Sequence, residues 1–155
     1  DLHLCDRRQR QMCIRDSSHG VTVKADLKPE EISFNNIDGV VLPGGMPGTV
    51  NLGKSETVTK AAVYCAENGK ITAAICAAPS VLGNLGILKG KKATCFPGFE
   101  KELEGATYTA APVEIDGNVI TGKGAGCAIL FGKAIVEKAV SAEAANKVCG
   151  DMQCP

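Results

Sequence analysis

The chain has 155 residues, of which 45% are hydrophobic and 22% are charged, so it is long enough to bury the core of one domain. Seventeen basic and 17 acidic side chains give a net charge of zero, which excludes a strongly basic surface for nucleic acid or anionic lipid. No apolar run approaches the roughly 20 residues of a membrane-spanning helix. We therefore expect neither a nucleic-acid nor a membrane partner.

Eight cysteines are spread along the chain, at positions 5, 13, 65, 76, 95, 127, 149 and 154. Several of them fall inside apolar, periodic segments, which is typical of free buried thiols rather than of a disulfide framework. Free thiols indicate a reducing compartment, and we expect a cytoplasmic protein.

The first 17 residues differ in composition from the rest of the chain. They hold four arginines, whereas the other 138 residues hold none and use lysine instead. They also lack the hydrophobic period of a strand or a helix. We expect residues 1–17 to be a non-native or disordered tract, followed by the domain at 18–148 and a tail at 149–155; a natural basic arm is the alternative.

From residue 21 onward the hydrophobic pattern predicts regular elements. The first half of the chain is predicted to form a strand at 21–25, a turn or short helix at 28–32, a buried strand at 40–42, a helix from Ser55 to just before Gly69 and a buried strand at 71–75. The second half is predicted to form a helix from 78 to about 85, a strand at 91–95, a hairpin at 111–124 that turns at Asp116-Gly117, and a helix from Ala125 to about Val140. This last helix has Leu130, Ala134 and Ile135 on one face, and the tail after it is expected to fray. Strands without alternation are typical of a parallel sheet that is covered on both faces. The pattern predicts an α/β fold with three layers and an antiparallel part from the hairpin.

Cys76 lies where the strand at 71–75 meets the following helix. The segment from Val40 to Cys76 has the length of a right-handed strand–helix–strand unit, so both of its strands end at the same edge of the sheet. The first strand is followed by Gly44 and Gly45, whose backbone can approach a ligand closely. We therefore expect Gly44 and Gly45 to face Cys76.

A cysteine at a sharp strand-to-helix corner is a candidate nucleophile. The start of the helix favours the thiolate, and the small residues Ala77 and Ala78 leave the sulfur accessible. The amides of Gly45 and Ala77 are candidate donors to an oxyanion. The alternative is that Cys76 is only a small core residue.

Four segments resemble the ThiJ/PfpI superfamily, specifically the parkinsonism-associated protein deglycase subfamily and its bacterial relatives. They are DGVVLPGGMPG at 38–48, AAICAAPSVLG at 73–83, KKATCFPGFE at 91–100 and DGNVITGKGAGCAILFGKAIVE at 116–137. The resemblance implies a flavodoxin-like, doubly wound, mostly parallel sheet, similar to class I glutamine amidotransferases. It also implies a nucleophilic, oxidisable Cys76, with Gly44, Gly45 and Ala77 around it.

The chain departs from the family pattern in three respects, of which the mildest is Cys-Ala-Ala-Pro at 76–79, where many relatives have Cys-Ala-Gly-Pro. The family's first strand, helix and second strand carry an acidic residue that hydrogen-bonds the reactive sulfur, and residues 1–17 hold unrelated sequence in that place. Some relatives have a histidine where this chain has Phe96. We therefore expect an N-terminally incomplete fold that lacks the first strand–helix–strand, lacks the general acid–base and is marginally stable alone.

The resemblance implies activity on small reactive aldehydes or glycated protein, as a glyoxalase or deglycase, with no cofactor or metal and with a homodimer in the full-length parent. Two alternatives stay open: an oxidative-stress sensor or chaperone that works through oxidation of Cys76, and an inactive fragment.

Other cysteines are weaker candidates. Cys95 ends a strand at the same edge as Cys76, so Cys95 and Phe96 are possible neighbours of the site, and Cys95 could resolve an oxidised Cys76 as a disulfide. Cys149 and Cys154 are interpreted as a surface pair. A zinc site could be assembled on paper from His3, Cys5, Cys13 and His19, but their spacing matches no compact zinc finger.

Overall fold

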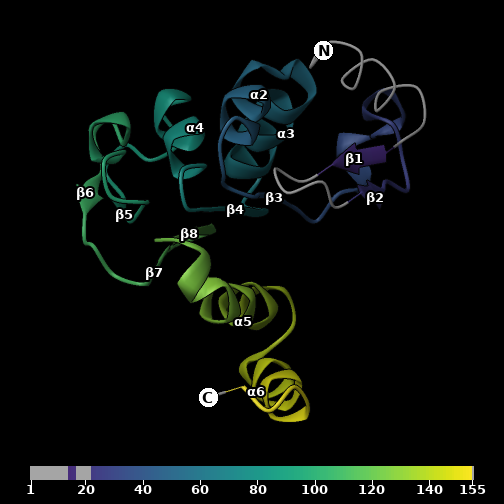
Figure 1. Ribbon diagram of the computed structural model, residues 1–155, viewed down its shortest axis with the longest axis vertical. Coiled ribbons are helices and arrows are strands. Elements are labelled where there is room, and N and C mark those ends of the chain that lie inside the picture. Colours follow the sequence, from purple (N-terminus) through teal and green to yellow (C-terminus); the bar gives the residue numbers. More distant parts are fainter. Residues whose placement is uncertain (1–13, 17–21, 155) are drawn as a thin grey trace. The chain divides into compact units, whose positions relative to one another are not determined.

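The computed structural model describes residues 14–16 and 22–154 (Figure 1). The chain forms two compact units, Asp1–Ile37 and Asp38–Pro155. The second unit holds every element of the predicted site.

The described part of the first unit is a small antiparallel ladder followed by two short helices. Strand β1 (Ile14–Asp16) pairs with β2 (Thr22–Lys24), with Ile14 opposite Lys24. The 3-10 helices η1 (Pro29–Glu31) and η2 (Phe34–Asn36) follow. The predicted strand at 21–25 and the helical piece at 28–32 are confirmed, and β1 lies in the tract that we expected to be non-native or disordered.

A four-stranded sheet forms the centre of the second unit. Its order is β3 (Gly39–Leu42), β4 (Ile71–Ile75), β8 (Val119–Gly122) and β7 (Val113–Asp116). The first three strands are parallel, and β7 pairs with β8 as an antiparallel hairpin. The predicted strands and the hairpin turn are confirmed, and Gly117 supplies the positive φ of 64° that this turn requires.

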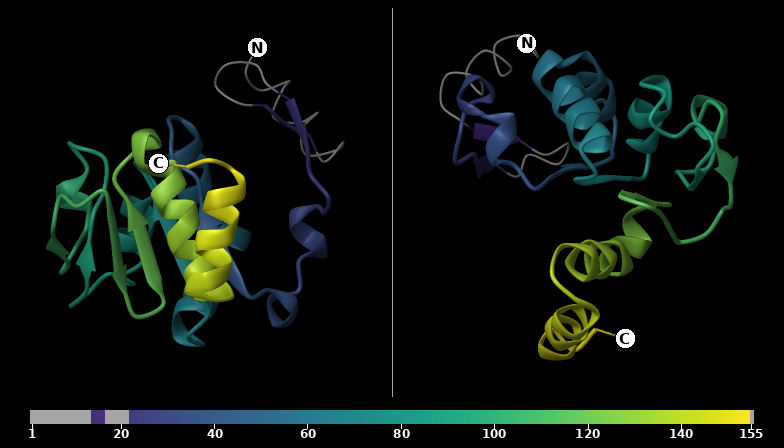
Figure 2. Two further views of the ribbon diagram at one scale, coloured as in Figure 1. Left: turned by 90° about the horizontal axis from the view of Figure 1, so that it is seen from below. Right: turned by 180° about the vertical axis from the view of Figure 1, so that it is seen from behind.

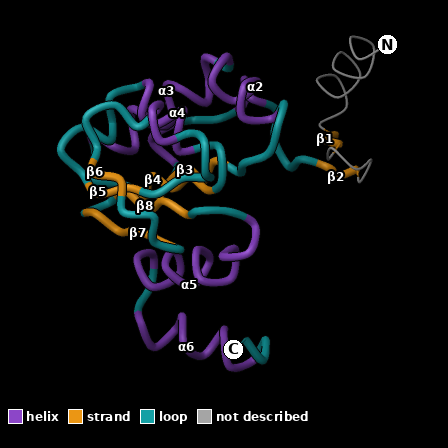
Figure 3. The backbone as a smooth tube through the Cα atoms, turned by 60° about the vertical axis from the view of Figure 1, so that its left-hand side comes forward, coloured by secondary structure: helices purple, strands orange, loops and turns teal. Residues whose placement is uncertain are grey.

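Helices cover both faces of this sheet, which gives the three layers that the sequence predicts (Figures 1 and 3). On one face lie α2 (Gly48–Lys54), α3 (Glu56–Glu67) and α4 (Pro79–Asn84), and on the other lies α5 (Ala128–Ala139). Helix α6 (Ala142–Asp151) packs against α5, beyond the sheet (Figure 2). Among the described residues, no helix has the length and apolarity needed to cross the membrane.

The strand β4 shows how the two cores are divided. Ala73 and Ala74 are both fully buried, yet they belong to different clusters because successive side chains of a strand point to opposite faces. Ala74 packs with Leu42 and Leu82 under the three helices, whereas Ala73 packs with Ile120 and Phe131 under α5. The alanines of β4 let helices approach the sheet closely from both sides.

Smaller elements complete this unit beside α4. Strand β5 (Lys92–Ala93) pairs in parallel with β6 (Thr107–Tyr108), and η3 (Glu100–Glu102) lies between them in the chain. The 3-10 helix η4 (Ala125–Cys127) leads into α5. The predicted strand at 91–95 is therefore shorter than expected and lies outside the main sheet.

Two expectations about packing and one about secondary structure were wrong. Val41 was expected to be buried in a two-sided strand, but it is 48% exposed because β3 ends the sheet and α5 covers β4 and β8 instead. Leu130 was expected on one face of its helix with Ala134 and Ile135, but it is 50% exposed, and Phe131 packs with Ala134 against the sheet instead. The segment expected to fray forms α6, whose first turn is capped by Ser141, its hydroxyl oxygen accepting from the Ala144 N–H at 3.1 Å.

The side chain of Asn118 links the turn between β7 and β8 to the segment that joins α3 to β4. The Asn118 amide donates to the carbonyl oxygens of Lys70 at 2.8 Å and Ala66 at 3.2 Å. The backbone carbonyl of Asn118 accepts from the Thr72 N–H at 2.9 Å. Asn118 therefore satisfies carbonyls at the end of α3 and fixes the start of β4 against β8.

Candidate active site around Cys76

The candidate site lies at the carboxyl edge of the parallel strands. Because β3 and β4 are parallel and in register from Gly39 and Ile71, their ends lie side by side. Gly44 follows β3 and Cys76 follows β4, so the structure brings together the two segments that the sequence predicted to face each other.

The backbone of Cys76 is held in an unusual conformation from both sides. Its φ of 65° lies in the left-handed region, which costs a residue with a side chain about 1–2 kcal/mol. The Cys76 N–H donates to the Gly122 carbonyl at 2.8 Å, and the Cys76 carbonyl accepts from the Phe96 N–H at 2.8 Å. These two bonds fix the sharp corner, and the thiol is half-buried rather than enclosed in the core.

Gly44 lies against this corner with no room for a side chain. A Cβ on Gly44 would collide with the Cβ of Cys76 and would lie 2.6 Å from the Ile75 carbonyl oxygen and 3.1 Å from the Ala77 nitrogen. The glycine is therefore required by the close approach of the two strand ends. Its neighbour Gly45 is different: it has open space around it but a φ of 90°.

Two amide groups, one at this corner and one in the facing glycine loop, have no protein acceptor among the described residues. Within the described residues, the N–H groups of Gly45 and Ala77 make no hydrogen bond. The Gly45 carbonyl, by contrast, is fixed by Thr49, whose N–H and hydroxyl donate to it at 2.8 and 3.0 Å. Thr49 therefore orients the glycine loop and leaves its amides available to a ligand.

The rim of the site is formed by the loop after β5 and the loop after β8. Phe96 is 46% exposed, and its ring lies against Gly124, where an added Cβ would come within 3.4 Å of the ring. Phe96 therefore occupies the rim position at which the resemblance places a histidine in some relatives, and it offers an apolar surface there.

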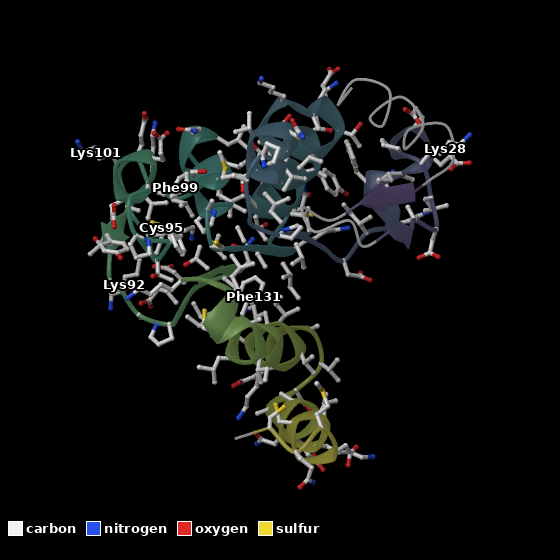
Figure 4. The ribbon with its side chains drawn as sticks, in the orientation of Figure 1. Lys28, Lys92, Cys95, Phe99, Lys101 and Phe131 are labelled. Atoms are coloured by element: carbon white, nitrogen blue, oxygen red, sulfur yellow. The ribbon has the colours of Figure 1, made fainter. Side chains whose placement is uncertain are left out.

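Cys95 lies next to Phe96 in the chain, but its thiol is directed into the core. The side chain is fully buried, in one cluster with Leu82 and Ala93, and Figure 4 shows it near Phe99. Burial, reinforced by the Glu100 carboxylate, raises the pKa of the Cys95 thiol to about 11. A thiol kept protonated and buried is poorly suited to resolve an oxidised Cys76.

Cys76 is a free thiol with no side-chain hydrogen bond to its sulfur within the described part of the chain. No group of three or more metal-binding side chains comes together there. The residues considered for a zinc site, His3, Cys5, Cys13 and His19, lie outside the described residues.

Sequence reasoning missed two contributors to this geometry. Thr49 lies on α2, a helix that the pattern did not predict because Asn51 and Gly53 weaken the helical signal in a short segment. Gly122 contributes only its carbonyl to Cys76, which no residue type reveals. Pro47 directly before α2 was a signal that could have marked its start.

Comparison with known proteins places this arrangement in a family. The sequence model of the DJ-1/PfpI family matches residues 9–138. The chain belongs to the DJ-1/PfpI family. The expected family and the expected fold are confirmed.

Solved structures of DJ-1/PfpI proteins superpose closely on the chain. Drosophila melanogaster DJ-1beta aligns with a TM-score of 0.86 and 31% identity, over 92% of this chain and 77% of the fly protein. Oxidized Toxoplasma gondii DJ-1 aligns with a TM-score of 0.87 and 30% identity, over 94% of this chain and 80% of that protein.

Sequence relatives include proteins named as deglycases. A deglycase of Pyrococcus abyssi is 35% identical over 108 residues, which cover 68% of this chain and 64% of that protein. The DJ-1 homolog B of Arabidopsis thaliana is 37% identical over 139 residues, 88% of this chain but only 32% of that protein. The chain thus spans about a third of the length of this plant relative.

Proposed function

We propose that the chain carries the cysteine site of a protein that acts on reactive carbonyl compounds, as a glyoxalase or a protein deglycase. The observation that carries the proposal is the strained, half-buried Cys76 at the sheet edge, opposite Gly44 and beside two unused amides. The deglycase names of related archaeal proteins support the substrate class.

The proposed chemistry begins with attack of the Cys76 thiolate on an aldehyde carbon. A carbon–sulfur bond forms, and the carbonyl electron pair moves to oxygen, giving a hemithioacetal. The free N–H groups of Gly45 and Ala77 are the proposed donors to that oxygen. Phe96 is the proposed apolar wall of the substrate site.

The later steps need a general acid–base. With methylglyoxal, a proton moves from the carbon bonded to sulfur to the neighbouring carbon, and water then hydrolyses the thioester to lactate and the free thiol. The described residues supply no carboxylate bonded to the Cys76 sulfur, so we assign this role to no residue. Full turnover, a homodimeric assembly and a cytoplasmic location are therefore further parts of this proposal.

Lactate formation from methylglyoxal tests the proposal. We expect Cys76→Ser to abolish it, while Cys127→Ser, which alters a buried thiol that bonds Gly124, serves as the matched cysteine control. Turnover retained by Cys76→Ser would overturn the scheme.

A second candidate function is an oxidative-stress sensor or chaperone without turnover. It is favoured by the half-buried, free thiol of Cys76 and by one related structure, which is of an oxidized protein. Two equivalents of hydrogen peroxide would then convert the Cys76 thiol to a sulfinic acid and release two waters. Intact-mass spectrometry after mild peroxide should show two added oxygens on Cys76 and no aldehyde turnover; a chain that shows neither reaction is an inactive fragment.

A further inference from the structure

The end of helix α6 brings two cysteines together through a backbone motif. Gln153 adopts a φ of 56°, which turns the chain back over the last helical turn. The Cys154 N–H then donates to the Cys149 carbonyl at 2.9 Å, and the Gln153 N–H donates to the Gly150 carbonyl at 3.0 Å. This pair of bonds is the Schellman arrangement, in which the side chains of the first and sixth residues come into contact.

At this helix end, the first and the sixth residue of the motif are both cysteines. Cys149 and Cys154 are free thiols, and each is half-buried. Burial and the adjacent Cys149 raise the pKa of the Cys154 thiol, because a second negative charge beside the first is unfavourable.

We propose that Cys149 and Cys154 form a dithiol site that exchanges with low-molecular-weight disulfides of the glutathione type and closes into a disulfide across the end of α6. The backbone hydrogen bond from the Cys154 N–H to the Cys149 carbonyl keeps the two residues next to each other, which is the proximity that a disulfide requires. The site is separate from Cys76, because α6 packs on α5 rather than on the edge of the sheet that carries Cys76.

The exchange proceeds in two steps that balance. The Cys149 thiolate attacks one sulfur of the external disulfide, forming a mixed disulfide and releasing one thiolate. Cys154, after losing its proton, attacks the Cys149 sulfur, forms the internal disulfide and releases the second thiolate. Two protein thiols are oxidised, one external disulfide is reduced, and the two protons go to the two released thiols.

The other described thiols are less suited to this reaction. Cys65 and Cys95 are fully buried, so an external disulfide does not reach their sulfur atoms. Cys127 is 8% exposed, and its thiol donates to the Gly124 carbonyl at 3.0 Å. Selective reaction at Cys149 and Cys154 is therefore the expected outcome when Cys76 is removed.

The test equilibrates the full chain carrying Cys76→Ser with mixtures of oxidised and reduced glutathione, so that the proposed aldehyde site takes no part. Trypsin cleaves after Lys147 and places both cysteines in the single peptide 148–155. We expect this peptide to lose the mass of two hydrogen atoms. Adding Cys149→Ser or Cys154→Ser should instead leave one glutathione on the remaining thiol.

A matched pair of variants tests whether the helix end promotes closure. Gln153→Gly favours the left-handed conformation and Gln153→Val opposes it, so the equilibrium constant for closure should be about tenfold higher in the glycine variant. When urea unfolds the chain, the equilibrium constant for disulfide closure should fall to the value measured for the synthetic peptide 148–155. Equal constants in the folded chain and in urea, or a stable glutathione adduct on Cys149 with Cys154 reduced, would overturn the proposal.

Discussion

Gly44 and Cys76 meet at the ends of adjacent parallel strands with no space for a Cβ on the glycine. The contact links the shape of the backbone to the position of the reactive sulfur. A substitution at Gly44 should therefore affect both stability and the site.

Gly44→Ala should lower the free energy of unfolding by about 1–3 kcal/mol, because the new methyl group overpacks against Cys76 and Ile75. Gly48→Ala is the matched control: nothing lies within 4 Å of its added Cβ, and it is helical, so it should be neutral or stabilising. Urea unfolding of both variants measures the difference. Equal stability of the two would contradict the close approach.

Cys76→Gly should be about 1 kcal/mol more stable than Cys76→Ala, although both remove the sulfur, because only glycine adopts a φ of 65° without strain. Ala110→Gly, at a φ of 57° far from the site in sequence, should show a gain of similar size. Thermal and urea unfolding of the variants provide the measurement. A more stable alanine variant would show that the corner is not strained.

Phe131→Ala should cost about 3–5 kcal/mol of unfolding free energy, whereas Leu130→Ala should cost less than about 1 kcal/mol. Phe131 is 5% exposed and fills the space between α5 and the sheet, as Figure 4 shows, while Leu130 is 50% exposed. Chemical denaturation checks the pair. If Leu130→Ala lost more unfolding free energy than Phe131→Ala, the face of α5 that carries Phe131 would not be the one packed on the sheet.

The raised pKa of Cys95 predicts a loss of stability at alkaline pH. The unfolded thiol loses its proton near pH 9, whereas the folded thiol keeps it to about pH 11, so the folded state binds more protons between these values. The free energy of unfolding attributable to Cys95 is therefore constant below pH 9 and falls as the pH rises towards 11.

Urea midpoints across this range, compared between the parent chain and Cys95→Ala, measure that contribution. The variant should show a shallower decline, because other titrating groups are common to both proteins. Parallel pH profiles would mean that the Cys95 thiol is not protected by burial.

The main sheet and its corner were predictable because their signals are local. The apolar run of β4 predicts a buried strand, and the turn at Asp116-Gly117 predicts the hairpin. The small residues after Cys76 mark the strand-to-helix corner, and the two glycines after β3 mark the loop opposite it.

The elements that the sequence did not reveal depend on distant partners. Strand β6 has only two residues, and it forms because it pairs with β5. In this pair Thr107 lies opposite Lys92, which is 15 positions earlier in the chain. Helix α6 buries only Ala145, so its apolar pattern is weak, although Ser141 was a readable cap. The exposure of Val41 follows from which strands α5 covers, which no property of β3 itself determines.

The anchoring of Asn118 has a practical consequence for engineering. Hairpin tips are ordinarily the safest places to insert a tag, a reporter domain or new chain termini. Here the amide of Asn118 is bonded to Lys70 and Ala66, some 50 residues away in the chain, so lengthening the loop would withdraw that amide from both carbonyls. Fusions to this protein are better made away from the tip between β7 and β8.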